Sequence, residues 1–395
     1  MRYLFATTRG AGHVGPLIPF ARAVKAAGHD VLFAGPEPAG RLVRRAGFAF
    51  AAVGAPGRAE AERAWAPVWS RETSPGMAAV VQDLFIGLHA RMALPGMLAA
   101  ARRFRPDVVV RETLEFSSAL VAESLGIAQV RIGIHLDSDT DANPLLIGVA
   151  TPALDALRPA LGLAADPEAL AIRESPVLTL APASTSGSAP ALRFRDTIAA
   201  AAASLPLWGD PADPLLYVSF GSEAAASHHF PGLYRHAARA LAELPVRTLL
   251  TIGDRRDPAE LGALPGSVRV ERWVPQAAVM AQASAMVGHG GSGSTLMALA
   301  AGVPLALVPL FVDGPSNARR VQALGAGIAL EHGPDGLGEA VGALLTDAGH
   351  RASARAVAAE IAALPPVEEA AAVLEAVAER DAVVERQALR LAPAR

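Results

Sequence analysis

The chain contains no cysteine among its 395 residues, which excludes disulfides, thiolate metal sites and a cysteine nucleophile. Charged residues make up only 18%, and the formal net charge of −3 includes no block of like charge. We therefore expect no nucleic-acid partner. Hydrophobic residues make up 52%, so the composition predicts a packed globular protein long enough for two domains.

We expect neither a secretory leader nor a membrane span in this sequence. The first residues, MRYLFATTRG, hold too short an apolar stretch for a signal peptide. The uncharged segment from Leu296 to Val312 is broken by Gly302, Pro304 and Pro309, and it is shorter than the roughly 20 residues of a membrane span. We interpret it as a buried helix, a turn and a buried strand, and predict a cytoplasmic protein without an integral membrane segment.

Strands and helices alternate twice along the chain, which predicts two α/β domains with parallel sheets. In the first half, strand Tyr3–Thr8 leads through a glycine-rich turn into a helix that starts at Pro16 and ends near Gly28. A second series follows a turn-rich linker, and a helical pattern follows the proline pair at 365–366. We predict an N-terminal Rossmann-like domain over 1–200, a linker over 201–213, a second Rossmann-like domain over 214–366, and a helix over 367–395 that crosses back to brace the N-terminal domain.

The first glycine-rich turn has the spacing of a dinucleotide-binding loop. Gly10, Gly12 and Gly15 spell G-x-G-x-x-G between a strand and a helix. A dinucleotide site needs an acidic residue at the end of the second strand, but that strand ends with the letters FAGP, and His13 occupies the mouth of the helix. Two interpretations stay open: a tight turn that only needs small residues, or a loop that admits a substrate while His13 points into a cleft.

A denser pattern lies in the second half of the chain. A strand over 285–288 delivers the glycine-rich loop HGGSGST (289–295) to a helix that we expect to begin near Ser294. Backbone N–H groups at a helix N-terminus bind phosphate oxygens, and His289 can donate a further hydrogen bond. Upstream, Trp273 can stack on a nucleobase and Gln276 can hydrogen-bond its polar groups.

Together these motifs resemble the donor-binding signature of family-1 glycosyltransferases with the GT-B fold, especially the bacterial enzymes that decorate natural products. The resemblance covers nearly the whole chain, including the GAGH loop, PDVVVRE and the SFGS turn, and it is densest between Glu271 and Gly327. It implies two Rossmann-like domains around a central cleft and an inverting transfer of a sugar from a nucleotide sugar to a hydroxyl of an apolar acceptor. The nucleotide sugar is a co-substrate, and no cofactor or metal is expected, because no Asp-x-Asp pair lies beside the donor loop.

The resemblance also implies roles for the matching residues. His13 would be the general base that takes the proton of the acceptor hydroxyl, and Asp313 would bond hydroxyls of the donor sugar. The implied donor site comprises Ser222, Trp273, Val274, Gln276, His289, Gly291, Gly293, Ser294, Thr295 and Asp313.

Two departures from the family pattern bear on the donor. Asp313 is followed by Gly314 where the family often has Asp-Gln. One side chain that could hydrogen-bond the donor sugar is therefore missing, which leaves room for a deoxysugar. No acidic residue lies between Trp273 and Ser294 to hold the ribose hydroxyls, so a thymidine diphosphate (dTDP) sugar is at least as compatible as a uridine diphosphate (UDP) sugar.

The acceptor side is less sharply defined by the sequence. A histidine base usually needs a carboxylate to orient its ring. Glu112 is the first choice for that partner and Glu115 the second, because both follow a buried strand and strand ends face the cleft in such sheets. For the apolar acceptor pocket we expect Trp69, Phe85 and Ile134.

Two other functions stay open at this point. A nucleotide-sugar epimerase would need carboxylates around the sugar, which are not found near the His289 loop, and a catalytically silent auxiliary partner of a glycosyltransferase would not need His13. Release of nucleoside diphosphate separates the three: a transferase needs an acceptor, an epimerase does not, and a silent protein releases none. The sequence leaves open the acceptor, the sugar, the type of glycosidic bond and whether the chain forms a homodimer.

Overall fold

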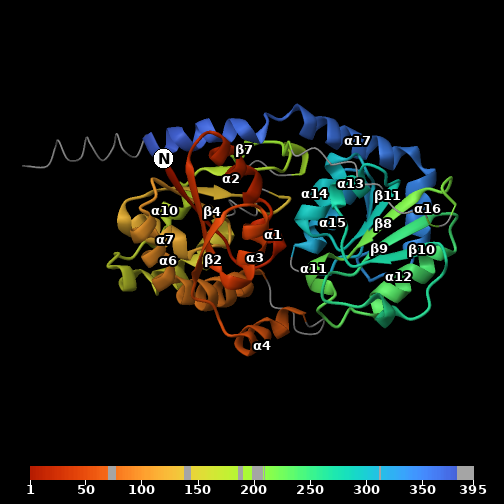
Figure 1. The fold of residues 1–395 in the computed structure, drawn as a ribbon, viewed down its shortest axis with the longest axis horizontal. Helices are drawn as coiled ribbons and strands as arrows, with labels where there is room; N and C mark the ends of the chain where they lie inside the picture. The colour runs from red at the N-terminus through yellow and green to blue at the C-terminus, as the bar shows by residue number, and fades with distance from the viewer. Residues whose placement is uncertain are drawn as a thin grey trace, which may run out of the picture.

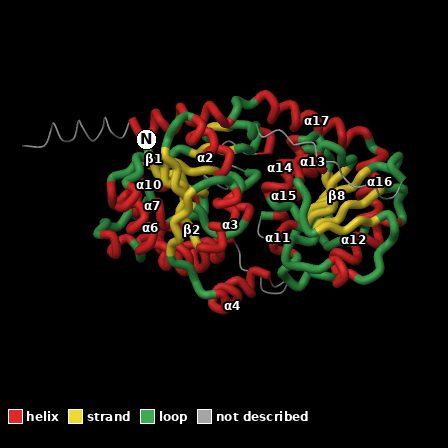
Figure 2. Tube along the Cα trace, viewed as in Figure 1, coloured by secondary structure: helices red, strands yellow, loops and turns green. Residues whose placement is uncertain are grey.

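The computed structural model describes residues 1–69, 77–137, 144–185, 190–197, 208, 210–310 and 313–379. These residues form two lobes (Figure 1). Each lobe has one parallel sheet with helices packed around it (Figure 2). The predicted fold of two α/β domains is confirmed.

The N-terminal lobe is built on a seven-stranded sheet with the order β3-β2-β1-β4-β5-β6-β7. Its strands are β1 (Arg2–Ala6), β2 (Asp30–Pro36), β3 (Ala49–Val53), β4 (Val108–Glu112), β5 (Ala128–Ile132), β6 (Val177–Thr179) and β7 (Leu192–Arg193). Its helices are α1 (Ala11–Val14), α2 (Leu17–Ala26), α3 (Glu37–Arg45), α4 (Arg58–Trp69), α5 (Met77–Ala79), the π-helical η1 (Val80–Ala90), α6 (Arg91–Phe104), α7 (Ser117–Leu125), α9 (Pro144–Asp155), η2 (Arg158–Leu161), α10 (Leu170–Arg173) and η3 (Ala183–Thr185). The strand order reverses between β1 and β4, so the loops after these two strands meet at one point of the sheet edge.

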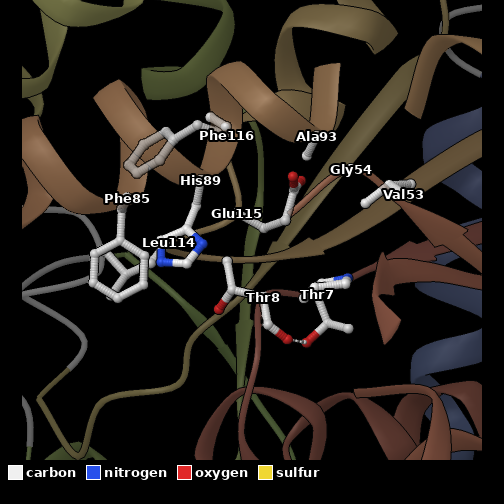
Figure 3. A pocket seen from close by; sticks show the side chains of 12 residues that line it. Thr7, Thr8, Val53, Gly54, Phe85, His89, Ala93, Leu114, Glu115 and Phe116 are labelled. Atoms are coloured by element: carbon white, nitrogen blue, oxygen red, sulfur yellow. Dashed lines mark hydrogen bonds between the residues drawn. The ribbon is translucent and has the colours of Figure 1, made fainter. Parts of the chain in front are cut away.

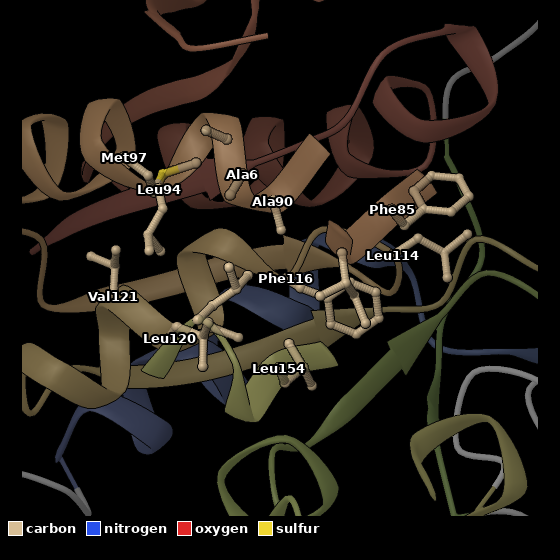
Figure 4. Packing of buried hydrophobic residues seen from close by; sticks show 14 of the residues in the cluster. Ala6, Phe85, Ala90, Leu94, Met97, Leu114, Phe116, Leu120, Val121 and Leu154 are labelled. Carbon is tan, nitrogen blue, oxygen red and sulfur yellow. The ribbon is translucent and has the colours of Figure 1, made fainter. Parts of the chain in front are cut away.

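The first strand shows why this sheet lies between two cores. Leu4 and Ala6 point into the cluster on one face, which Figure 4 shows in part, whereas Tyr3 and Phe5 point into the cluster on the other. All four side chains are fully buried. Alternate residues of a strand face opposite sides, so a parallel strand covered on both faces is apolar throughout its length.

The C-terminal lobe repeats this plan with a six-stranded parallel sheet of order β10-β9-β8-β11-β12-β13. Its strands are β8 (Leu215–Ser219), β9 (Arg247–Thr251), β10 (Val268–Glu271), β11 (Ala285–Gly288), β12 (Leu305–Leu307) and β13 (Gly327–Ala329). Its helices are α11 (Gly221–Ala224), α12 (Gly232–Ala242), η4 (Pro258–Leu261), α13 (Gln276–Met280), α14 (Ser292–Ala300), α15 (Gly314–Ala323), α16 (Leu337–Thr346) and α17 (Ala348–Ala363). Here the order reverses between β8 and β11, which brings the loops after these strands together.

Several local predictions can be compared with this fold. The uncharged segment from Leu296 onward runs through α14, a turn and the buried β12, as predicted. The expected start of α14 near Ser294 was wrong by two residues, because the helix begins at Ser292 with Gly291 as its N-cap. Strands β3, β6 and β7 were not predicted.

After α17 the chain returns to the N-terminal lobe. Pro366 pairs with Arg195, and the 3₁₀-helical η5 (Val367–Glu369) leads into a helix over 370–379. Val367, Ala370 and Leu374 belong to the N-terminal core, and this segment lies along the top of Figure 1. The residues 198–207 and 209 of the linker region and 380–395 of the terminal helix lie outside the described part of the chain.

The two lobes also meet at the loop that follows β5. Leu136 of this loop is buried in the C-terminal core, and its backbone N–H donates to the Ser292 hydroxyl at 3.0 Å. The neighbouring Asp137 pairs with Arg320 of α15 at 3.0 Å. The N-terminal lobe therefore contacts the C-terminal lobe directly at the glycine-rich loop.

One helical run is long and apolar enough to cross a membrane by length and composition. It spans Val80–Phe104, where η1 continues into α6. However, 56% of its apolar window is buried inside the protein, which is the property of a core helix. This is a different segment from the one singled out in the sequence, and the absence of a membrane segment and the cytoplasmic location stay predictions.

Candidate functional site

The end of the N-terminal sheet brings a histidine and a carboxylate together. His13 lies in the short helix α1, in the loop after β1, and Glu112 is the last residue of β4. Because β1 and β4 are neighbours at the point of reversal, His13 Nδ1 lies 3.0 Å from Glu112 Oε1. The His13 side chain is 22% exposed and that of Glu112 is fully buried. The first-choice partner of His13 is thus in place.

Three further hydrogen bonds hold the Glu112 carboxylate. The backbone N–H and the hydroxyl of Thr8 donate to Oε1 at 3.2 and 2.8 Å, and the N–H of Leu114 donates to Oε2 at 2.6 Å. Burial alone would raise the pKa of Glu112, but the charge of His13 and these hydrogen bonds outweigh burial and lower the pKa. Glu112 is therefore a carboxylate that accepts from the Nδ1–H of His13, and in the neutral form of the His13 ring this leaves the lone pair on Nε2.

The second-choice carboxylate, Glu115, has another task. Its oxygens accept from the N–H groups and hydroxyls of Ser117 and Ser118, the first residues of α7. Burial raises the pKa of Glu115, although these bonds and the charge of Arg111 oppose the shift. Glu115 thus caps a helix, and the pairing with His13 falls to Glu112 alone among the two candidates.

A largely apolar pocket lies beside the His13–Glu112 pair. It encloses about 330 Å³, part of which is open to solvent. Its lining residues are Thr7, Thr8, Pro36, Val53, Gly54, Phe85, His89, Ala90, Ala93, Leu114, Glu115 and Phe116 (Figure 3). The ring of Phe85 lies 5.7 Å from that of His13, so the pocket adjoins the histidine.

The predicted acceptor residues are placed differently from one another. Phe85 lines the pocket, whereas Ile134 packs against the N-terminal core just after β5 and is not one of the lining residues. The side chain of Trp69 lies outside the described part of the chain. His89 and Trp65 are not among the predicted acceptor residues, but both contact Phe85: the ring centroids lie 6.3 and 5.6 Å from it.

In the C-terminal lobe, His289 lies between two glycines. Its loop follows β11, and Gly221 follows the neighbouring strand β8. A Cβ at Gly221 would lie 2.7 Å from His289 Cε1, and a Cβ at Gly291 would also overlap the ring. Burial lowers the pKa of His289, while Asp313 and a hydrogen bond to the Ser219 carbonyl oppose the shift. Both glycines are therefore needed to seat this imidazole at the start of α14.

The first turn of α14 supplies backbone donors. Gly291 caps the helix without a side chain, so Gly293 and Ser294 present N–H groups that have no acceptor within the helix. The N-terminus of a helix carries partial positive charge and favours an anion. The hydroxyl of Thr295 is buried and has no hydrogen-bond partner among the described residues.

A hydrogen-bond network joins this loop to α15. Asp313 Oδ2 accepts from the Ser292 hydroxyl at 2.9 Å and from the Asn317 amide at 3.1 Å. The same amide donates to the Gly290 carbonyl at 2.7 Å, and Asn317 is only 2% exposed. Asn317 and Ser292 are not among the predicted site residues, although they hold Asp313 against the glycine-rich loop.

The other residues predicted to bind the nucleotide sugar differ in how exposed their side chains are. Trp273 is 68% exposed, so its indole is not part of the core and is available for stacking. Gln276 donates to the Tyr217 hydroxyl at 3.0 Å. Val274 is buried in the C-terminal core, so a contact with a nucleotide would come from its backbone. Ser222 lies in α11, but its side chain lies outside the described part of the chain.

Comparison with known proteins gives consistent matches over the whole chain. The family model of the erythromycin biosynthesis protein CIII-like C-terminal domain matches residues 237–377. The L-demethylnoviosyl transferase of Streptomyces niveus is 33% identical over 384 residues, which cover 92% of this chain and 95% of that protein.

Two solved structures agree with this result. The glycosyltransferase SnogD from Streptomyces nogalater has a TM-score of 0.76 at 30% identity, covering 96% of this chain and 99% of that chain. The Streptomyces sp. SF2575 glycosyltransferase SsfS6, solved with thymidine diphosphate, has a TM-score of 0.74 at 26% identity, covering 95% and 99%. The chain therefore belongs to the bacterial natural-product glycosyltransferases of the GT-B fold and is a nucleotide-sugar-dependent glycosyltransferase.

Proposed function

We propose that the enzyme transfers a sugar from a dTDP-sugar to a hydroxyl of an apolar natural product, with inversion at the anomeric carbon and His13 as the general base. The observation that carries this proposal is the hydrogen bond between His13 Nδ1 and the buried Glu112 carboxylate. A histidine base needs a free ring nitrogen on one side and an orienting acceptor on the other, and this pair provides both.

In the proposed reaction the acceptor hydroxyl gives its proton to His13 Nε2 as its oxygen attacks the anomeric carbon. The bond between that carbon and the diphosphate oxygen breaks, and the nucleoside diphosphate leaves with the electron pair. The imidazolium that forms is stabilised by Glu112, whose negative charge is secured by Thr8 and Leu114. A single displacement of this kind inverts the configuration.

The donor side of the proposal rests on the loop between β11 and α14. The N–H groups of Gly293 and Ser294 at the start of α14, together with His289, would meet the charge of the departing diphosphate. Trp273 would stack on the base, and Asp313 would face sugar hydroxyls from its place beside Ser292. We propose no requirement for a divalent cation, because the N–H groups of this loop and His289 would already stabilise the negative charge of the diphosphate.

The thymidine nucleotide is favoured over the uridine one by two observations. No acidic side chain lies between Trp273 and Ser294 to hold two ribose hydroxyls. The glycosyltransferase SsfS6, with the same fold, was solved with thymidine diphosphate. The Gly314 that follows Asp313 favours a deoxysugar, which offers fewer hydroxyls to read.

Titration calorimetry with thymidine and uridine diphosphates, each with and without a chelator, tests the donor side. We expect the thymidine nucleotide to bind at least as tightly and the chelator to leave its affinity unchanged. Release of nucleoside diphosphate from a nucleotide sugar then tests the reaction class. Release that depends on an added phenolic acceptor supports a transferase, whereas release or sugar isomerisation without any acceptor would contradict it.

A further inference from the structure

The pocket beside His13 contains a second histidine that the proposed reaction does not use. His89 is carried by η1, whose π-helical turns are rare and are frequently found at functional sites. It is 8% exposed and lines the pocket together with Phe85, four residues earlier. Figure 3 shows both rings projecting from η1 on one side of the pocket, with Thr7 and Thr8 on the other.

Trp65 fixes which nitrogen of His89 carries the proton. The indole N–H of Trp65 lies 3.2 Å from His89 Nε2. An indole nitrogen can only donate, so Nε2 must hold a lone pair and His89 must be neutral with its proton on Nδ1. Burial, followed by the charges of Arg9 and His13, lowers the pKa of His89 to about 4, which agrees with a neutral ring at neutral pH.

The Nδ1–H of His89 then has no protein acceptor among the described residues. Within the described part of the chain, Trp65 is the hydrogen-bond partner of His89, through the other ring nitrogen. His89 lines the pocket, so this donor is available to water or to a bound ligand. A bound molecule with an oxygen at this place would satisfy it.

The rest of the pocket defines what kind of molecule that is. Phe85, Leu114 and Phe116 give it apolar walls, which favour an uncharged ligand. Phe85 touches both histidines, with its ring 5.7 Å from His13 and 6.3 Å from His89. A ring held against Phe85 can therefore present a hydroxyl to His13 and a second oxygen to His89.

We propose that His89 is a specificity-determining residue of the acceptor site, which selects flat, uncharged ring systems that carry a carbonyl or ether oxygen in addition to the reacting hydroxyl. This inference rests on the proposed function, because it takes the pocket beside His13 as the acceptor site. His89 reads the acceptor by donating from Nδ1, and Trp65 is the positioning residue that keeps the proton there.

The test compares two phenols of matched shape, para-hydroxyacetophenone, which carries a carbonyl, and para-ethylphenol, which lacks it. Their dissociation constants are measured by titration calorimetry on the full chain, with and without saturating thymidine diphosphate. We expect the wild type to prefer the ketone by about three- to tenfold, the worth of one neutral hydrogen bond. His89→Phe should abolish the preference, and His89→Asn should keep most of it because its amide N–H lies near the Nδ1 position.

Nitrogen NMR of the wild-type protein gives a readout that does not depend on any variant. We expect His89 to be the neutral Nδ1–H form at neutral pH and its Nδ1 signal to shift on addition of the ketone. Trp65→Phe should populate the other tautomer and reduce the preference. A wild type without preference, a His89→Phe variant that retains it, or equal weakening of both phenols in that variant would overturn the proposal. The two phenols are also compared without nucleotide, so this test of His89 does not depend on nucleotide binding. Failure of thymidine diphosphate to bind would therefore contradict only the donor side of the proposed function.

Discussion

The Nδ1 atom of His13 lies 3.0 Å from Oε1 of Glu112, although 99 positions separate the two residues in the chain. Parallel pairing of β1 with β4 places the ends of these strands side by side, and the loop after β1 returns His13 over the end of β4. The proposed catalytic pair thus depends on the topology of the sheet.

Glu112→Gln should lower turnover by about 10²–10⁴ without changing the affinity for thymidine diphosphate. The amide no longer stabilises the imidazolium and lets His13 adopt the wrong tautomer. Because the two residues act as one unit, adding His13→Ala to this variant should cost little more than either change alone. Steady-state kinetics of the single and double variants measure this, and fully additive losses would contradict the pairing. Glu123→Gln, which removes a carboxylate paired with Arg158, is the matched control and should leave turnover unchanged.

Trp273→Ala should weaken binding of the nucleoside diphosphate by about 1–3 kcal/mol, the usual worth of stacking a base on an aromatic side chain. The indole is 68% exposed, so the free energy of unfolding should change little. Trp208→Ala makes a useful contrast, because that indole lies within 5.5 and 5.8 Å of the Arg247 and Arg269 guanidinium groups. This control should lower stability and spare nucleotide affinity. Calorimetry and thermal unfolding separate the two effects, and an unchanged affinity in Trp273→Ala would remove the indole from the donor site.

Asn317→Asp should damage the donor loop more than its small change in shape suggests. The Asn317 amide donates to the Gly290 carbonyl and to Asp313, and a carboxylate there would repel both oxygens. We expect at least a tenfold loss of nucleotide affinity and a loss of stability of about 1–3 kcal/mol. Ser316→Asp, one residue earlier on the exposed side of α15, is the control and should cost far less. Equal behaviour of the two variants would show that the network does not hold the loop.

The sheets could be predicted from short-range patterns, and the His13–Glu112 pair from the rule that neighbouring strand ends meet at one edge of a parallel sheet. Apolar strands alternate with helices, and Glu112 directly follows one such strand. The edge strands β6 and β7 have only three and two residues, too few to show a period. His89 was missed because η1 is π-helical, and its wider turn breaks the spacing by which an amphipathic helix is recognised. The hydrogen-bond network that joins Asn317 to Ser292 was missed because a polar contact between two helices leaves no periodic signal.

Acid should destabilise the protein through His89. Its pKa in the folded protein is about 4, below the ordinary value near 6.5 expected in the unfolded chain. As the pH falls below 6.5 the unfolded chain takes up the proton first, so stability is lost down to about pH 4. His89 alone should lower the free energy of unfolding by about 2 kcal/mol between pH 7 and pH 5. Urea unfolding at both values should show a smaller loss in His89→Asn, which does not titrate, and the same loss in both proteins would contradict a neutral buried His89.

The most direct test of the proposed roles of the two lobes compares His13→Ala with His289→Ala. Each protein is titrated with thymidine diphosphate by calorimetry and then assayed for turnover at saturating donor with a phenolic acceptor. His289 lies in the donor loop, so its loss should weaken nucleotide binding. His13 lies on the acceptor side, so its loss should leave nucleotide affinity nearly unchanged and lower turnover by about 10²–10⁴, with a smaller drop for an acidic nitrophenol that ionises unaided. If His13→Ala instead abolishes nucleotide binding and spares turnover at saturation, the glycine-rich loop around His13 is a nucleotide site and the assignment of the two lobes is wrong.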